Sequence, residues 1–310
     1  CPSQITIHIT ARENKNVRDN MLKLGFRVSE IIPFSRRKLN EDFYYTQFPS
    51  NHDSAYVFEV DGVVHFNQND CYLNDYECSQ IKILFPKIDY WWMQFSLAGY
   101  YANRDDLKGL QAAKDFHIQA FKKYHAFFKP SVSIPFASYV YFCKKYNSFL
   151  NQWSVSLREL VQENETINFE IPFFGDVIGR CDNEKSISSW ESLISKRLLD
   201  VDEPIEVKDE DIVDLANRWL EQTHQTLPYK KVSVDFYEDE RAFVFDFDKK
   251  QAHFTDAKHN IAGTLTKEGL LCFVKFPWGA DTLNITSCFD VRDKNMWKFL
   301  LQYKDSGYVR

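Results

Sequence analysis

The chain has 310 residues, of which 44% are hydrophobic, 26% are charged and an unusually high 16% are aromatic. This composition excludes a mainly disordered chain and is typical of a globular protein with a large core. The formal net charge of -6 at pH 7 disfavours a broad nucleic-acid or anionic-membrane interface, so we expect small molecules or proteins as partners. No apolar run approaches the roughly 18 residues needed to span a bilayer, so no transmembrane helix is expected.

The first 160 residues alternate strand and helix signals, which predicts an α/β fold. The clearest signal is Asp61-Gly62 between two β-rich runs, because this dipeptide accommodates the positive φ angles of a type I′ hairpin turn. A long apolar stripe after residue 105 predicts a helix that ends before Pro130. The expected elements are strand Gln4–Thr10, helix Asn16–Leu24 ended by Gly25, hairpin strands Ser54–Val60 and Val63–Asn67, strand Tyr90–Phe95, helix Asp105–Phe128 and strand Val132–Phe136.

After Val161 the pattern changes. A loop-like stretch with Gly175, Gly179 and polar residues 182–189 leads into the acidic segment Asp200–Asp214, which is either a solvated linker with a first helical turn or a cation site. We place the domain boundary here, giving an α/β region at 1–200 and a small α+β domain at 201–310. The elements expected beyond it are helix Asp211–Thr223, strands at 232–237, 242–247, 252–254, 263–266, 270–276 and 282–286, and helix Lys294–Tyr303.

The seven cysteines are an odd number and form no CxxC pair. This usage predicts reduced thiols in a cytoplasmic protein, with most cysteines acting as small buried hydrophobes and a zinc knuckle as the alternative. The sequence also lacks GxGxxG, GxxxxGK[ST], HExxH and GxSxG strings, which excludes the usual dinucleotide, P-loop, zincin and serine-hydrolase fingerprints.

Polar residues follow the second hairpin strand directly, in the run Asn67-Gln68-Asn69-Asp70-Cys71. Ligands gather at the carboxyl ends of strands in α/β sheets, so Asp70 is a candidate metal ligand, with a loop-capping carboxylate as the alternative. His52 and Asp53 precede the hairpin and are expected near the same sheet edge, either as site residues or as a pair satisfied by backbone groups.

The remaining polar candidates have simpler interpretations. His65 alternates with apolar neighbours on a strand and is expected to be packed or solvent-facing rather than a ligand. His117 and His125 lie eight residues apart on the expected helix, which is too far for them to share one ion. A last group either lines the mouth of the same cleft or only caps and packs: Asn147, Asn151 and Trp153.

Four segments in sequence order resemble the second half of a metallo-β-lactamase fold, most nearly the hydrolase-like domain of CMP-N-acetylneuraminate hydroxylases and their bacterial relatives. The segments lie between about residues 50 and 155: the hairpin with its Asn67–Cys71 run, Ile88–Ser96 followed by Ala98-Gly99, the long Lys-rich helix, and Ile134–Tyr139. The resemblance implies a partial αββα sandwich. It also implies that Asp70 bridges zinc or iron ions that activate a bound water.

Two departures from this family concern the metal ligands. The HxHxDH string of the family's first half is absent, because no two of the eight histidines are two residues apart, and Ala137 and Ser138 follow the last strand where ordinary members place a histidine. Asp70 alone cannot hold a catalytic metal, which needs at least three protein ligands. The Cys and His pairs of a Rieske domain are also absent, so oxygenase activity by this chain alone is not expected.

Two functional hypotheses remain open. The chain is the C-terminal portion of a metal-dependent hydrolase-like or hydroxylase-like enzyme acting on a small molecule, with its HxHxDH ligands missing or supplied by another polypeptide. Alternatively, it is a catalytically inactive binding or scaffold protein on a degenerate half-fold, which docks partners at an exposed sheet edge.

The C-terminal region carries a second resemblance. Phe276–Leu283, followed by Ile285 and Phe289, resembles the end of small sterol-carrier-like domains. Five phenylalanines are expected to form either the core of one sheet or the wall of a lipid tunnel: Phe243, Phe245, Phe247, Phe273 and Phe276.

Overall fold

The computed structural model describes residues 2–11, 15–50, 53–197, 202, 205–222 and 228–306. The chain divides into two compact units that are discontinuous in sequence. Unit 1 comprises residues 1–96, 117–139 and 155–190, and unit 2 comprises residues 97–116, 140–154 and 191–310. The expected division of the chain into independent domains at residue 200 stays a prediction.

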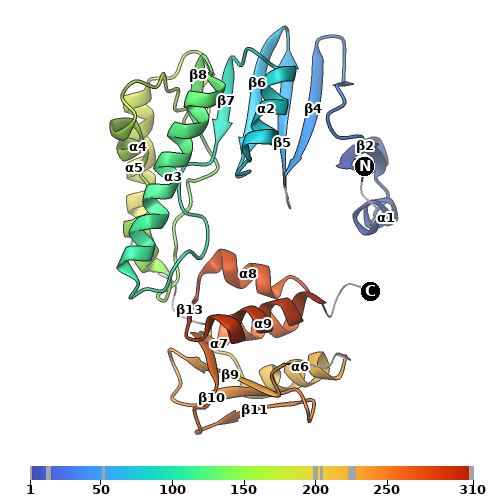
Figure 1. The fold of residues 1–310 in the computed structure, drawn as a ribbon, viewed down its shortest axis with the longest axis vertical. Coiled ribbons are helices and arrows are strands. Elements are labelled where there is room, and N and C mark those ends of the chain that lie inside the picture. The colour runs from blue at the N-terminus through green and yellow to red at the C-terminus, as the bar shows by residue number, and fades with distance from the viewer. Residues whose placement is uncertain are drawn as a thin grey trace. The chain divides into compact units, whose positions relative to one another are not determined.

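Unit 1 is built on a six-stranded sheet with the order β3-β4-β5-β6-β7-β8 (Figure 1). Neighbouring strands from β3 to β6 are antiparallel, and β6, β7 and β8 run parallel. The strands are β3 (Arg37–Lys38), β4 (Phe43–Ser50), β5 (Asp53–Val60), β6 (Val63–Asn69), β7 (Tyr90–Met93) and β8 (Val132–Pro135).

The β5–β6 hairpin confirms the sequence prediction. Asp61 and Gly62 have φ angles of 50° and 78°, as a type I′ turn requires, and Val60 pairs with Val63 across the turn. β6 runs two residues further than expected, to Asn69. Gln68 and Asn69 therefore belong to the strand, and Asp70 follows its end directly.

Helices cover one face of this sheet. They are α2 (Asp75–Leu84) and the part of α3 (Leu107–Phe128) from His117 onward, since residues 107–116 belong to unit 2. Unit 1 also contains α4 (Leu157–Glu163) and the part of α5 (Asn183–Arg197) up to Trp190. The Trp91 ring lies 4.7 Å from the Phe121 ring of α3, and the Phe66 ring lies 4.9 Å from that of Phe128. These large side chains are fully buried, so the core of unit 1 lies between the sheet and α3.

The apolar stripe expected along α3 is only partly correct. Leu110, Phe121 and Tyr124 are buried, whereas Leu107 is 58% and Phe116 is 48% exposed. The polar residue His117, which lies outside the expected stripe, is buried instead and is only 1% exposed.

A short βαβ element begins the chain, with β1 (Thr6–Thr10), α1 (Asn16–Lys23) and β2 (Arg27–Ile31), preceded by one 3-10 turn at Pro2–Gln4. β1 and β2 pair in parallel. Gly25 has a φ of 86° just after the helix, which confirms its expected role as a helix stop. The sequence patterns predicted β1 and α1 but not β2, β4 or α2.

Unit 2 contains a five-stranded sheet with the order β11-β10-β9-β12-β13. Its strands are β9 (Lys231–Phe236), β10 (Ala242–Asp246), β11 (Gln251–Thr255), β12 (Ile261–Leu265) and β13 (Phe289–Val291). Its helices are α6 (Asp209–Glu221), α7 (Lys267–Lys275), α8 (Gly279–Thr286) and α9 (Lys294–Ser306), with a 3-10 helix at Ser148–Trp153.

Two strands predicted in this unit are wrong, because residues 270–276 and 282–286 lie in or next to α7 and α8. Leu270, Phe273 and Val274 are buried, and their spacing is that of one helix face. Thr266 caps α7 through a hydrogen bond from Gly269 N to its hydroxyl. A short apolar run does not distinguish a strand from a buried helix, and here the helical period prevails.

The loop predicted at residues 182–189 is also wrong, because this stretch begins α5. Asp182 accepts a hydrogen bond from Lys185 N, and Ile187 and Trp190 are buried one turn apart.

The mixed α/β class of the whole chain is confirmed. In the described part of the chain, no helix is both long and apolar enough to cross a membrane.

Candidate metal centre at the edge of the unit 1 sheet

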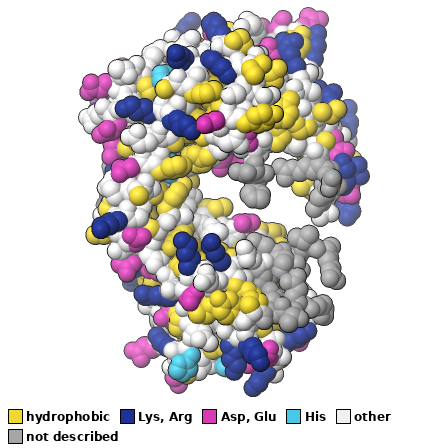
Figure 2. Space-filling view, in the orientation of Figure 1, with side chains coloured by type: hydrophobic (Ala, Val, Ile, Leu, Met, Phe, Trp, Pro, Cys, Tyr) yellow, Lys and Arg dark blue, Asp and Glu magenta, His cyan; other side chains and the backbone are white. Residues whose placement is uncertain are grey.

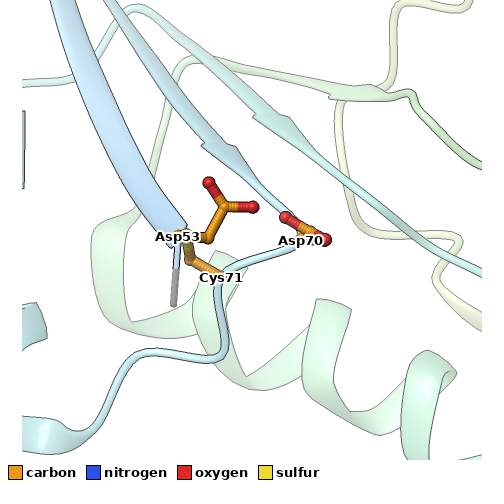
Figure 3. A group of neighbouring side chains, drawn as sticks. All are labelled: Asp53, Asp70 and Cys71. Carbon is orange, nitrogen blue, oxygen red and sulfur yellow. The ribbon is translucent and has the colours of Figure 1, made fainter. Parts of the chain in front are cut away.

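Two carboxylates and a thiol meet where the central strands β5 and β6 of the unit 1 sheet begin and end, at the edge of the sheet formed by strand ends. Because β5 and β6 are antiparallel, Asp53 at the start of β5 lies beside Asp70 and Cys71, which follow the end of β6. One ligand atom from each of the three side chains lies within 4.8 Å of the others. Figure 3 shows the Asp53 and Asp70 carboxylates directed toward each other. The edge predicted for Asp53 and Asp70 is therefore correct, and Cys71 joins them.

Gln68 holds the loop that carries Asp70 and Cys71. Its side chain is fully buried, accepts a hydrogen bond from Trp91 Nε1 at 3.0 Å and donates one from Nε2 to Cys71 O at 2.8 Å. Cys71 N donates in turn to Gln68 O. Asn69 adopts a φ of 57°, a left-handed conformation that Asn tolerates and that turns the chain away from the strand. The loop is therefore fixed from inside the core.

The three side chains are all acidic groups, and their proximity disfavours the ionised forms. Burial raises the pKa of the Asp70 carboxyl above its usual value, and the hydrogen bond and charge of Asp53 raise it further. Burial, followed by the charges of Asp53 and Asp70, raises the pKa of the Cys71 thiol to about 12. Bringing these groups together without a cation therefore disfavours their charged forms.

The raised pKa of Asp70 predicts that Asp70→Asn stabilises the metal-free protein at neutral pH. A carboxyl whose pKa is higher in the folded state binds its proton more tightly there, so ionisation above the usual carboxyl pKa destabilises the fold. We expect a gain of up to about 0.5 kcal/mol at pH 7. The gain shrinks as the pH falls through the raised pKa of Asp70 and is lost below the usual carboxyl pKa. Urea denaturation across this pH range measures it, and a loss of stability at pH 7 would contradict the assignment.

A cavity of about 340 Å³ lies beside Asp53. Its wall includes His8 and Thr10 of β1 and Gln47, Ser54 and Tyr56 of the sheet. The buried Gln47 Nε2 lies within hydrogen-bond distance of the Thr10, Ser54 and Tyr56 hydroxyls, and His8 Nδ1 lies 2.9 Å from the Tyr45 hydroxyl. Most of the residues that line the cavity are polar or charged, and Asp53 belongs to both the cavity and the three-residue cluster.

The donor set is suited to a divalent transition metal. Zinc binds thiolate and carboxylate ligands, and its catalytic sites use three protein ligands and leave one position open. Asp53, Asp70 and Cys71 supply three such donors. Sequence reasoning treated Cys71 as an inert thiol, although its position directly after Asp70 was a usable signal.

The structure places the other histidine candidates elsewhere. His52 lies outside the described residues. His65 stacks on Tyr90 with ring centroids 4.8 Å apart, on the face of the sheet opposite Trp91, and burial lowers its pKa. It is a packed residue, as expected, and does not belong to the three-residue cluster.

His117 and His125 have separate structural partners. His117 Nδ1 lies 2.8 Å from the Tyr72 hydroxyl, and burial lowers its pKa to about 4, so it stays neutral at physiological pH. His125 Nδ1 lies 2.9 Å from Ser133 Oγ. The prediction that these two histidines do not share an ion agrees with these contacts.

The amide candidates of unit 2 stabilise loops. The Asn151 side chain bonds both N and O of Phe142, and Asn147 accepts from Lys144 N and donates to Thr286 O. Trp153 packs at the edge of a small cluster around Leu150. These contacts favour capping and packing over a role in a cleft.

The acidic segment and the phenylalanines of unit 2 also have structural roles. Asp209 pairs with Arg241 and Lys267, so the first turn of α6 is a salt-bridged helix start rather than a cation site. The phenylalanine rings pack against one another in the core, with Phe243 5.2 Å from Phe245 and Phe245 6.5 Å from Phe273 of α7. The interpretation as core is confirmed for Phe243, Phe245, Phe247 and Phe273, although Phe273 comes from a helix. It is wrong for Phe276, which is half-buried and stacks on the exposed Trp278.

No protein-family model matches this chain, and no curated protein matches it. Among solved structures, it is similar to a candidate Zn-dependent hydrolase of the metallo-β-lactamase superfamily from Thermotoga maritima, with 12% sequence identity and a TM-score of 0.26. The match covers 47% of this chain and 62% of that one, so the chain spans less than two thirds of that protein. None of these findings supports the nearer resemblance to CMP-N-acetylneuraminate hydroxylases, which stays a prediction.

Proposed function

We propose that this chain binds a divalent transition metal, zinc or iron, through Asp53, Asp70 and Cys71 and is part of a metal-dependent hydrolase-like protein. The observation that carries the proposal is the convergence of three donor atoms within 4.8 Å, at the end of a parallel strand. When bound, such an ion supplies Lewis acidity and lowers the pKa of a water ligand.

The residues of the chain have distinct parts in this proposal. The two carboxylates and the thiol hold the ion, and Gln68 fixes the loop that presents Asp70 and Cys71. The neighbouring polar cavity gives a small-molecule substrate access to the Asp53 side of the site. Further ligands come, in this proposal, from a second polypeptide with an HxHxDH string. A cytoplasmic location keeps the Cys71 thiol reduced and able to bind metal.

Zinc binding to the purified chain tests the proposal directly. We expect about one zinc ion per chain, and an affinity at least about 100-fold lower in Asp70→Asn and in Cys71→Ser, because each variant removes one of three ligands. The Cys71 thiol must lose its proton to bind, so the wild-type affinity should rise with pH. Calorimetric titration with zinc chloride measures both effects.

Matched controls separate ligand loss from general effects of charge or thiol removal. Asp61→Asn changes an exposed carboxylate in the hairpin turn, and Cys143→Ser changes a free thiol in unit 2. Both controls should bind zinc as the wild type does. Absence of zinc and iron binding by the wild type, or equal binding by the ligand and control variants, would refute the metal site.

The second candidate, a non-catalytic binding protein, is favoured by a groove of about 430 Å³ on the open face of the sheet. The expected docking place, a sheet edge, is less suitable, since the edge strand β3 has only two residues, both basic, and Phe169 bridges to β8. The groove is lined mainly by apolar and aromatic residues: Phe43, Phe58, Val60, His65, Asn67, Trp92 and Phe136. A protein that binds no metal but is retained by a partner through this face would support it.

A further inference from the structure

The groove on the open face of the unit 1 sheet has the size and lining of a small-molecule site. Its volume of about 430 Å³ falls within the range of such sites, which are mostly apolar with a few polar groups. The strand register places the strand residues of its lining on the sheet face opposite Phe66 and Trp91, which pack against α3. The groove therefore lies on the side of the sheet away from α3.

The groove includes the place where the sheet changes from antiparallel to parallel pairing. β6 is antiparallel to β5 on one side and parallel to β7 on the other. Asn67 and Trp92 are paired near the carboxyl ends of β6 and β7, and Phe136 directly follows β8. Open α/β sheets bind ligands at the carboxyl ends of parallel strands, so the topology favours a ligand here.

The groove carries no formal charge. Its described lining residues include no Lys, Arg, Asp or Glu. Figure 2 shows acidic and basic side chains spread over the visible surface of unit 1, so the lack of charge is a property of this groove and not of the whole unit. The His65 ring is neutral at pH 7, because burial lowers its pKa. Since an ion without a partner is costly to bury, the groove is suited to an uncharged ligand.

Aromatic rings form most of the wall and hold one another in place. The ring centroids of Phe43 and Phe58 lie 6.0 Å apart, and those of Trp92 and Phe136 also lie 6.0 Å apart, edge to face. The His65 ring lies 6.5 Å from that of Trp92. All five rings are half-buried, so none of them projects freely into solvent. This wall is preorganised for contact with a flat aromatic ligand.

Two polar side chains in this apolar wall have hydrogen-bonding groups to offer. Asn67 Oδ1 accepts from Asn69 N at 3.0 Å, which fixes the amide and leaves Nδ2 without a protein partner in the described part of the chain. The neutral imidazole of His65 has one donor and one acceptor nitrogen, and neither is hydrogen-bonded to a described residue. A carbonyl oxygen and an N–H group on one ligand can pair with both side chains.

We propose that this groove binds an uncharged, flat aromatic molecule that carries a carboxamide group. The aromatic wall contacts the ring system, Asn67 Nδ2 donates to the carbonyl oxygen and His65 accepts from the amide N–H. The proposal is independent of the metal centre, because no lining residue belongs to the three-residue cluster or to the cavity beside Asp53. It assigns the groove to a small molecule, whereas the second candidate function assigns it to a protein partner.

Calorimetric titration of the full chain with 2-naphthamide tests this inference, with 2-naphthoate as a probe of the same shape that carries a negative charge. We expect the amide to bind at least about tenfold more tightly than the carboxylate. Asn67→Asp keeps the acceptor for Asn69 N but loses the donors, and Trp92→Leu removes aromatic surface, so each should weaken binding of the amide at least about tenfold. Asn295→Asp, the same change at an exposed residue of unit 2, should leave binding unchanged.

Three results would overturn the inference. They are no binding of 2-naphthamide to the wild type, equal binding of the amide and the carboxylate, or unchanged binding in both groove variants. A protein partner that occupies this groove in a chain that does not bind 2-naphthamide would support the second candidate function instead. Thermal unfolding of each variant establishes that weaker binding does not come from loss of the fold, and the comparison of the two probes needs only the wild type.

Discussion

Replacing Trp91 by Ala is expected to destabilise unit 1 by about 4 kcal/mol, the typical cost of truncating a buried aromatic residue. Trp91 is fully buried, and its ring lies 4.7 Å from that of Phe121 on α3. The substitution leaves a cavity between the sheet and α3, and it leaves Gln68 Oε1 without its donor. Urea denaturation followed by circular dichroism measures the loss.

Trp91→Phe separates packing from hydrogen bonding. The phenyl ring retains most of the apolar contact, but the buried Gln68 carbonyl stays unpaired, which costs about 1–3 kcal/mol. Because Gln68 also holds Cys71 O, this variant should weaken zinc binding while the protein stays folded. Val177→Ala, a change at a side chain 62% exposed, is the control for a neutral apolar substitution. A Trp91→Phe protein with unchanged stability would contradict the role assigned to Gln68.

Replacing Asp290 by Ala is expected to destabilise unit 2 by about 3 kcal/mol, because it breaks a buried, hydrogen-bonded charge network. The Asp290 carboxylate, 5% exposed, accepts from Arg104 N, Arg104 Nε and the Tyr237 hydroxyl. Arg104 also lies over the Tyr237 ring, at 4.4 Å from its centroid. Removal of the carboxylate leaves all three donors unpaired.

The matched control for Asp290 is Asp248, which pairs with Lys230 at the surface. The Asp248 side chain is 60% exposed, and exposed pairs contribute at most about 1 kcal/mol, so Asp248→Ala should have little effect. Thermal unfolding of both variants compares them. Equal stabilities of Asp290→Ala and Asp248→Ala would show that the buried network does not stabilise unit 2.

Local chemistry determined the elements that the sequence predicted well. The β5–β6 hairpin follows from Asp61-Gly62, whose residues tolerate positive φ, and the end of α1 follows from Gly25. The run of apolar residues in α7 misled the prediction, because short apolar segments have no clear period and the Thr266 cap is a single residue. Such segments take the structure that their tertiary neighbours favour.

In the candidate metal centre, too, some features follow from the local sequence and others from tertiary packing. The sequence by itself determined that Asp70 follows a strand, and a sheet places such residues at one edge. The sequence also predicted Asp53 near that edge, because the hairpin pairing of β5 with β6 brings it back there. Only the tertiary structure decided that Cys71 joins the two carboxylates, because the contacts of Gln68 hold the loop that carries it. In unit 2, no sequence pattern predicted that Asn103 bonds the backbone of Val291, because these residues meet only through long-range packing. Spacing along the chain encodes local conformation, whereas convergence of distant side chains depends on how the elements pack.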